Sequence, residues 1–187
     1  MALFIGIDQS VLHTGICILN EDASVYYLGL IEPKGLRDHE RLAYIRDGLT
    51  AVLGELRFAT GVMEGYSYGS VNKKFLLGEV GAVIKLALFD HCDKCFDAAP
   101  KQLKKFVCSK GSASKEEVMI AIEKQWGVVI QDDNVADAYS LARIGYEIAR
   151  PGSVMRHQLD VVKMIKSKDL KKERKVPAKK RQYKDAV

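Results

Sequence analysis

Three acidic residues stand at places in the sequence where a carboxylate is costly to bury. Asp8 ends the apolar run of residues 3–7, Glu64 follows a second apolar run, and Asp137 lies inside the apolar segment VADAYSLA. Three carboxylates held together repel one another and do not all ionise unless a cation compensates them. Oxygen ligands of this kind suit Mg²⁺ or Mn²⁺. If the fold brings the three acids together, they predict a divalent metal site.

Each acid also has a purely structural interpretation. Asp8 could accept backbone hydrogen bonds in the turn that follows it, and Glu64 could cap a turn or pair with a lysine. Asp137 could be the acid in the first turn of a helix that begins at Asn134, where negative charge is favourable. The three acids considered together are more informative than any one of them.

The apolar spacing predicts the elements that must position these acids. Short apolar runs bounded by turn residues indicate strands, and apolar residues that recur every three or four positions indicate helices. The sequence predicts strands at residues 3–8, 14–19, 24–32, 60–64 and 95–98, and helices at residues 36–58, 75–89, 100–107, 114–126 and 135–149. This order is typical of an α/β domain with a mixed five-stranded sheet, antiparallel in strands one to three and parallel in strands one, four and five.

In such a sheet the first and fourth strands are expected to be neighbours. Asp8 and Glu64 would then lie side by side at their carboxyl ends, and the helix of residues 135–149 would bring Asp137 to them. We expect Asn134 or Asp133 to cap that helix, and Ser114 with Glu117 to form a capping box for the helix before it.

Charge divides the chain unevenly. From residue 163 onward there are eleven Lys and Arg against three acids, a net charge of +8, whereas residues 1–162 carry 18 basic and 21 acidic residues, a net charge of −3. We therefore expect a globular domain at residues 1–157 and a basic, flexible tail at residues 158–187 that favours a nucleic-acid partner or serves only solubility. No membrane span or signal peptide is expected, and the four cysteines are expected to be reduced thiols.

Six motifs occur in one order along residues 4–148: GIDQSVLHTG, MEGYSYG, LGEVGAVIK, APKQLKKFV, KGSASKEEV and DNVADAYSLA. Together they resemble the RuvC family of Holliday junction resolvases, in its bacteriophage-type branch. The resemblance implies an RNase H-like fold and a homodimeric, metal-dependent endonuclease for DNA recombination, repair or phage DNA processing. Such an enzyme makes paired symmetric nicks in four-way DNA junctions and leaves 5′-phosphate and 3′-hydroxyl ends. It would work in the cytoplasm of a bacterium or a phage-infected host cell.

The resemblance also assigns metal ligands. It implies that Asp8, Glu64 and Asp137 bind two Mg²⁺ ions, with Mn²⁺ able to substitute. A fourth family ligand, usually Asp or His, falls on Asn134, whose amide oxygen brings no charge, and Asp133 could substitute for it.

The resemblance assigns the DNA contacts as well. It implies that Lys104 and Lys115 act near the scissile phosphate and that Tyr66 or Tyr68 stacks on an unpaired base. Lys73 and Lys74, just after the tyrosine loop, are further DNA-binding candidates. Without the resemblance, the lysines could be ordinary surface residues and one tyrosine could be part of the core.

Parts of the sequence are also compatible with other functions. The protein could be a broader nuclease that also cuts flaps and forks, or a module that binds branched DNA and cleaves it weakly, which Asn134 would explain. A sugar kinase with a phosphate loop at residues 8–15 would need a second phosphate motif that the sequence lacks. A zinc site at HCDKC lacks the second pair of ligands, and His13 near Asp8 is more typical of a turn histidine than of a catalytic one.

Overall fold

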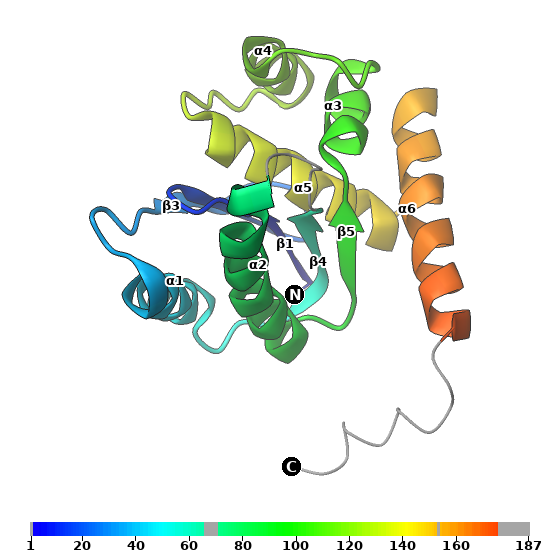
Figure 1. Cartoon of the computed structure of the whole chain (residues 1–187). Helices are drawn as coiled ribbons and strands as arrows, with labels where there is room; N and C mark the ends of the chain where they lie inside the picture. The colour runs from blue at the N-terminus through cyan, green and yellow to red at the C-terminus, as the bar shows by residue number, and fades with distance from the viewer. Residues whose placement is uncertain (1, 66–70, 153, 176–187) are drawn as a thin grey trace.

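The computed structural model describes residues 2–65, 71–152 and 154–175. Its centre is a mixed five-stranded sheet in the order β3-β2-β1-β4-β5 (Figure 1). The strands are β1 (Leu3–Asp8), β2 (Thr14–Leu19), β3 (Val25–Ile31), β4 (Phe58–Glu64) and β5 (Cys95–Ala98). Antiparallel pairing joins β1, β2 and β3, and parallel pairing joins β1, β4 and β5. The predicted sheet is therefore confirmed in its order and in its directions.

Helices cover both faces of this sheet. One apolar core joins the sheet to α1 (Asp38–Leu53) and α2 (Val71–His91). The other core joins it to α3 (Pro100–Cys108), α4 (Lys115–Trp126), α5 (Asp133–Ala149) and α6 (Arg156–Lys175). Since β1 contributes side chains to both cores, all six of its residues are buried, which explains why its sequence is apolar without alternation.

Close packing of α5 on β1 depends on Gly6. A Cβ atom at Gly6 would lie 2.1 Å from the backbone oxygen of Ala138 and 2.2 Å from the backbone nitrogen of Ala142. Any side chain at this position would therefore push α5 away from the sheet. The absence of a side chain lets α5 lie directly on β1, and this contact positions the first turn of α5 over the end of the strand.

The two predicted helix caps have different outcomes. Ser114 and Glu117 form the expected capping box of α4, with N–H···O distances of 3.2 Å and 2.8 Å. The predicted cap of α5 is wrong, because the cap is Asp132, whose Oδ1 accepts from the backbone nitrogens of Asn134 (2.9 Å) and Val135 (3.0 Å). The helix begins two residues earlier than expected, so the capping position moves to the acid before it.

The boundary expected after residue 157 lies inside α6. Val161, Val162 and Ile165 of this helix are buried, and α6 contacts α3 and β5. Lysine density favours disorder, but these apolar residues recur on one side of a helix and give it a surface to bury. The folded part therefore continues beyond the predicted boundary, and residues 176–187 lie outside the described part of the chain. None of the described helices is long and apolar enough to span a membrane.

Candidate active site

The fold brings the three acids of the sequence analysis to one place. Asp8 is the last residue of β1 and Glu64 is the last residue of β4, and these parallel strands are hydrogen-bonded neighbours. The carboxyl ends of parallel neighbours meet at the same edge of a sheet. There the Asp8 carboxyl donates a hydrogen bond to the Glu64 carboxylate. Asp137, in the first turns of α5, is near enough for its charge to act on Glu64.

Burial and mutual repulsion disturb the ionisation of all three acids. Burial, the hydrogen bond with Glu64 and the charge of Glu64 raise the pKa of Asp8 to about 9. Burial and the charge of Asp8 raise the pKa of Asp137 to about 7, and burial also raises the pKa of Glu64. The positive charges of Lys104 and Lys115 lower the pKa values of Glu64 and Asp137 and so oppose this rise. At neutral pH the three acids therefore do not all ionise, as expected for a carboxylate cluster without a cation.

One oxygen of this cluster has no partner in the structure. Asp8 is only 5% exposed, and its buried Oδ1 makes no hydrogen bond. Next to it, Gln9 Nε2 donates to the backbone oxygen of Glu64 at 2.8 Å, while the buried Gln9 Oε1 makes no hydrogen bond. An unpaired buried oxygen costs about 1–3 kcal/mol. A cation bound at the cluster would give the Asp8 oxygen a partner.

These residues fit a divalent cation through the chemistry of their donor atoms. Carboxylate oxygens are the ligands that Mg²⁺ and Mn²⁺ prefer. As the side chains are arranged, however, no group of three or more His, Cys, Asp or Glu is close enough to hold a metal within the described part of the chain. In this arrangement the Asp8 carboxyl is protonated and hydrogen-bonded to Glu64. Cation binding would have to displace that proton.

The residues that precede Asp137 form an acidic start to α5. Asp132 caps the helix and its charge contributes to the raised pKa of Asp8. Asp133 forms an ion pair with Lys115. Asn134 donates its side-chain nitrogen to Asp132 Oδ1 at 3.4 Å. Asp132 was not among the predicted site residues, although the segment QDDN directly before an apolar helix was the signal that could have identified it.

The two lysines assigned to the scissile phosphate lie beside the acids. Lys104 belongs to α3 and is partly buried, and Lys115 is the first residue of α4, with 62% of its side chain exposed. Their charges act on Glu64 and on Asp137. The fold thus brings two cations from separate helices to the same edge of the sheet. Their role toward DNA stays a prediction.

The other residues selected from the sequence are four DNA-binding candidates and His13. Tyr66 and Tyr68 lie outside the described residues, and Lys73 and Lys74 lie in the first turn of α2, so their proposed DNA contacts stay predictions. His13 faces Glu32 rather than Asp8, and its Nε2 lies 3.6 Å from Oε1 of Glu32.

Zinc at HCDKC is not favoured by the structure. His91 Nδ1 hydrogen-bonds the backbone oxygen of Leu56 at 2.9 Å, and no third ligand accompanies Cys92 and Cys95 among the described residues.

Comparison with known proteins agrees with this geometry. The family model described as crossover junction endodeoxyribonuclease RuvC matches residues 4–144. Among curated proteins, RuvC of Chloroherpeton thalassium is 30% identical over 152 residues, covering 76% of this chain and 80% of that protein. RuvC of Chloroflexus aggregans is 28% identical over 145 residues, covering 74% of this chain and 88% of that protein.

Solved structures show the same fold. Thermus thermophilus RuvC in complex with a Holliday junction substrate superimposes with a TM-score of 0.66 at 21% identity, covering 76% of this chain and 91% of that one. The yeast mitochondrial Holliday junction resolvase Ydc2 gives a TM-score of 0.53 at 14% identity, covering 87% of this chain and 84% of that one. The mixed sheet and its flanking helices are therefore an RNase H-like fold. Because the family model spans most of the chain, including all three acids, the protein belongs to the RuvC family of crossover junction endodeoxyribonucleases.

Proposed function

We propose that this protein is a metal-dependent, structure-specific endonuclease that resolves four-way DNA junctions by paired symmetric nicks with 5′-phosphate and 3′-hydroxyl ends. One observation supports this most strongly. In a chain of the RuvC family, Asp8, Glu64 and Asp137 meet at the carboxyl edge of the sheet, and the pKa values of all three are raised. Acids whose pKa values are strongly shifted cluster at functional sites.

Asp8, Glu64 and Asp137 are the proposed ligands of Mg²⁺, or of Mn²⁺ in its place, with two ions per site and Asn134 as a neutral fourth ligand. When bound, such ions lower the pKa of a water molecule and stabilise the leaving oxygen. The unpaired Oδ1 of Asp8 supports this role, because it is buried and has no hydrogen bond to lose. Asp133 is the alternative to Asn134, and it could take this role once its ion-pair partner Lys115 has moved to the phosphate.

Lys104 and Lys115 are the proposed phosphate contacts. Each belongs to a helix beside the acids, so that a phosphate bound at this edge would meet positive charge. Lys115 would exchange Asp133 for the phosphate. That exchange is cheap, because an exposed ion pair stabilises a protein by only about 0–1 kcal/mol.

Further positive charge lies on α6, outside the part that the family model matches. Its buried residues fix the helix to α3 and β5, while Lys163, Lys166 and Lys168 are exposed. We infer that this exposed lysine surface contacts a duplex arm of the junction, a role that the sequence analysis gave to a basic, flexible tail.

Two symmetric nicks require two active sites, so the proposed enzyme is a homodimer. Phe75, Leu86 and Phe89 are 76%, 66% and 59% exposed, and their spacing places them on one side of α2. An exposed apolar surface of this kind supports pairing with a second copy. Sedimentation of the purified protein tests it, and a monomer at micromolar concentration would contradict it.

The cleavage test uses an end-labelled four-way junction beside linear duplex and a 5′ flap, each with Mg²⁺, with Mn²⁺ and with EDTA. Paired symmetric nicks that need metal support the proposal. Equal cutting of flap and junction would replace it with the broader branched-DNA nuclease. Tight binding without cutting in either metal would replace it with the binding module and would point to Asn134 as the reason.

Asp8→Asn is the matched control for this test. The variant should bind the junction but fail to cut it, because the ligand and the phosphate contacts are separate groups. The place of action follows from the substrate, and we propose the cytoplasm of a bacterium or a phage-infected cell. The curated relatives compared above come from Chloroflexus aggregans and Chloroherpeton thalassium, so the bacteriophage-type branch stays a prediction.

A further inference from the structure

Two cysteines flank the corner at which α2 leads into β5. Cys92 directly follows the last residue of α2, and Cys95 is the first residue of β5. Both lie against Gly61 of β4. Cys95 is the register partner of Gly61, and a Cβ atom added to Gly61 would lie 2.7 Å from Cys92 Sγ. The missing side chain of Gly61 thus leaves room for a thiol beside the first residue of β5.

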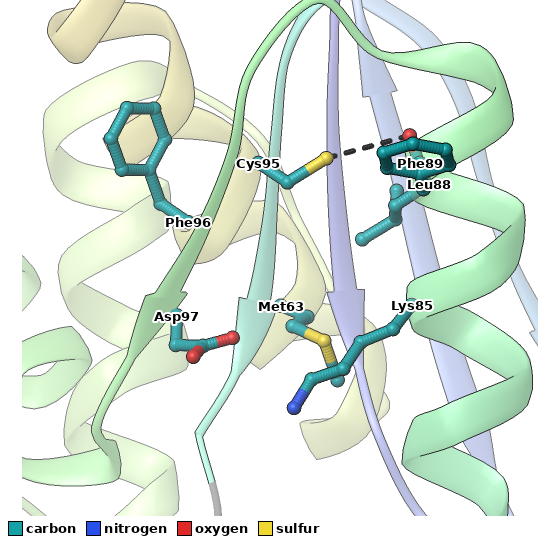
Figure 2. A pocket seen from close by; sticks show the side chains of 7 residues that line it. All are labelled: Met63, Lys85, Leu88, Phe89, Cys95, Phe96 and Asp97. Atoms are coloured by element: carbon teal, nitrogen blue, oxygen red, sulfur yellow. Dashed lines mark hydrogen bonds between the residues drawn. The ribbon is translucent and has the colours of Figure 1, made fainter. Parts of the chain in front are cut away.

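The two thiols face the same side of the sheet. Cys95 Sγ donates to the backbone oxygen of Leu88 in α2 at 3.4 Å (Figure 2). Cys92 packs against the apolar core between the sheet and α2, and its side chain is hydrogen-bonded to that of Cys95. The two sulfur atoms are therefore within hydrogen-bonding range. None of the four cysteines of the chain is in a disulfide, and Cys17 is fully buried.

The surroundings of Cys95 make it the accessible member of the pair. Cys95 is exposed and lines a cavity of about 300 Å³, with Lys85 and Asp97 on the same walls (Figure 2). Cys92 is half-buried behind it. Asp93 and Lys94, which separate the two cysteines, are both exposed and add no net charge. A small disulfide approaching from solvent would therefore meet Cys95 first.

We propose that Cys95 and Cys92 form a reactive dithiol at which the protein undergoes reversible thiol–disulfide exchange with small-molecule disulfides of the glutathione class. In the first step the Cys95 thiolate attacks one sulfur of the disulfide. A mixed disulfide forms on Cys95, and one small thiolate leaves and takes up a proton. In the second step the Cys92 thiolate attacks Cys95 Sγ and expels the second small thiolate. Two protein thiols are oxidised, and one small disulfide is reduced to two thiols.

The order of the two steps follows from the pair itself. The hydrogen bond with Cys95, burial, and the charges of Cys95 and Asp93 together raise the pKa of the Cys92 thiol far above its usual range. A mixed disulfide on Cys95 removes both the hydrogen bond and the negative charge of that sulfur. The pKa of Cys92 then falls, and Cys92 becomes able to attack the adjacent bond. The first step thus activates the second.

The test uses the reduced full-length protein, glutathione disulfide as the probe, and no DNA. After exchange, the remaining thiols are blocked and the products are identified by intact mass and peptide mapping. The expected product has lost two hydrogen atoms, keeps no glutathione, links Cys92 to Cys95, and returns to the starting mass on reduction. Stable glutathione on Cys95 of the unaltered protein, or a bond that involves Cys17 or Cys108, would overturn the proposal.

Three variants sharpen this test. Cys92→Ser should trap glutathione on Cys95, and absence of that adduct would refute the assigned order. Cys95→Ser should slow the first reaction by roughly tenfold or more, since the accessible thiol is gone. Cys108→Ser, which changes another partly exposed cysteine, should leave the rate and the product unchanged. The unaltered protein alone can confirm or refute the bond, so a variant that fails to fold does not leave the proposal undecided.

Discussion

Replacement of Asp8 by Asn should stabilise the metal-free protein while it abolishes cleavage. Asp8 is buried and its Oδ1 has no partner, so its ionised form is strongly disfavoured in the folded state. Asn has nearly the same shape and cannot ionise. Its amide nitrogen can also donate to Glu64, as the protonated Asp8 carboxyl does.

The size of the effect follows from the pKa of Asp8. Folding raises it from 3.8 to about 9. Between these values the folded protein keeps a proton that the unfolded chain has released, so the free energy of unfolding falls as the pH rises. Each pKa unit corresponds to about 1.4 kcal/mol, so the penalty at pH 7 has a ceiling of about 4 kcal/mol. Because Asp8 shares its proton with Glu64, we expect Asn to recover about half of this, or about 2 kcal/mol.

The assay is urea denaturation in EDTA at several pH values from 4 to 9. The unaltered protein should lose stability as the pH rises, and Asp8→Asn should lose less. In a separate thermal melt at pH 7, the Tm of the variant should be about 4–8 °C higher, since 1 kcal/mol shifts the Tm of a chain of this size by about 2–4 °C. Asp90→Asn, which replaces an exposed carboxylate on α2, is the matched control and should follow the unaltered protein.

Two results would refute this reasoning. The first is an Asp8→Asn variant no more stable than the unaltered protein at pH 8. The second is a gain in stability that is as large at pH 4 as at pH 8, because a gain from packing would not depend on ionisation. Either result would mean that Asp8 is already compensated in the folded protein and would weaken its proposed role as a metal ligand.

Three further predictions concern cation binding, helix packing and DNA binding. Mg²⁺ at a hundredfold excess over its Kd should stabilise the unaltered protein by about 3 kcal/mol in thermal melts and Asp8→Asn far less. Gly6→Ala should lower the free energy of unfolding by about 3 kcal/mol and reduce cleavage, because the new methyl group would meet the backbone of α5 at 2.1 Å. Combined Gln substitution of Lys163, Lys166 and Lys168 should weaken junction binding and flatten the plot of log affinity against log salt by about 0.9 for each phosphate that the protein no longer neutralises.

The same experiments have matched controls. Gly78→Ala, in α2, adds a methyl group where nothing lies within 4 Å, and it should stabilise the helix instead. Combined Gln substitution of Lys34, Arg37 and Arg46 removes the same charge from the opposite edge of the molecule, near α1, and should leave most of the salt dependence intact. An equal loss in both triple variants would assign the effect to net charge rather than to α6. Deletion from residue 163 is a poorer test, because it removes the buried Ile165.

Local sequence patterns were sufficient to predict the sheet. Each strand is a short apolar run closed by turn residues, and two short connections leave the first three strands little choice but antiparallel neighbours. The capping box of α4 was equally local, since Ser114 and Glu117 are three residues apart. The start of α5 could not be predicted from the local sequence, because three consecutive polar residues could each cap the helix. In the structure Asp132 is the cap, since its side chain accepts from the backbone nitrogens of Asn134 and Val135.

The sequence by itself determined which residues could carry the chemistry. An acid directly after a buried strand or inside an apolar helix is identifiable without coordinates, because burial of a carboxylate needs a reason. Only the tertiary structure decided how these acids share a proton, that Lys115 forms an ion pair with Asp133, and that α6 packs against α3 and β5. It also decided that Cys92 and Cys95 meet over Gly61. These contacts join separate segments, and their energies depend on distance and burial, which no local pattern encodes.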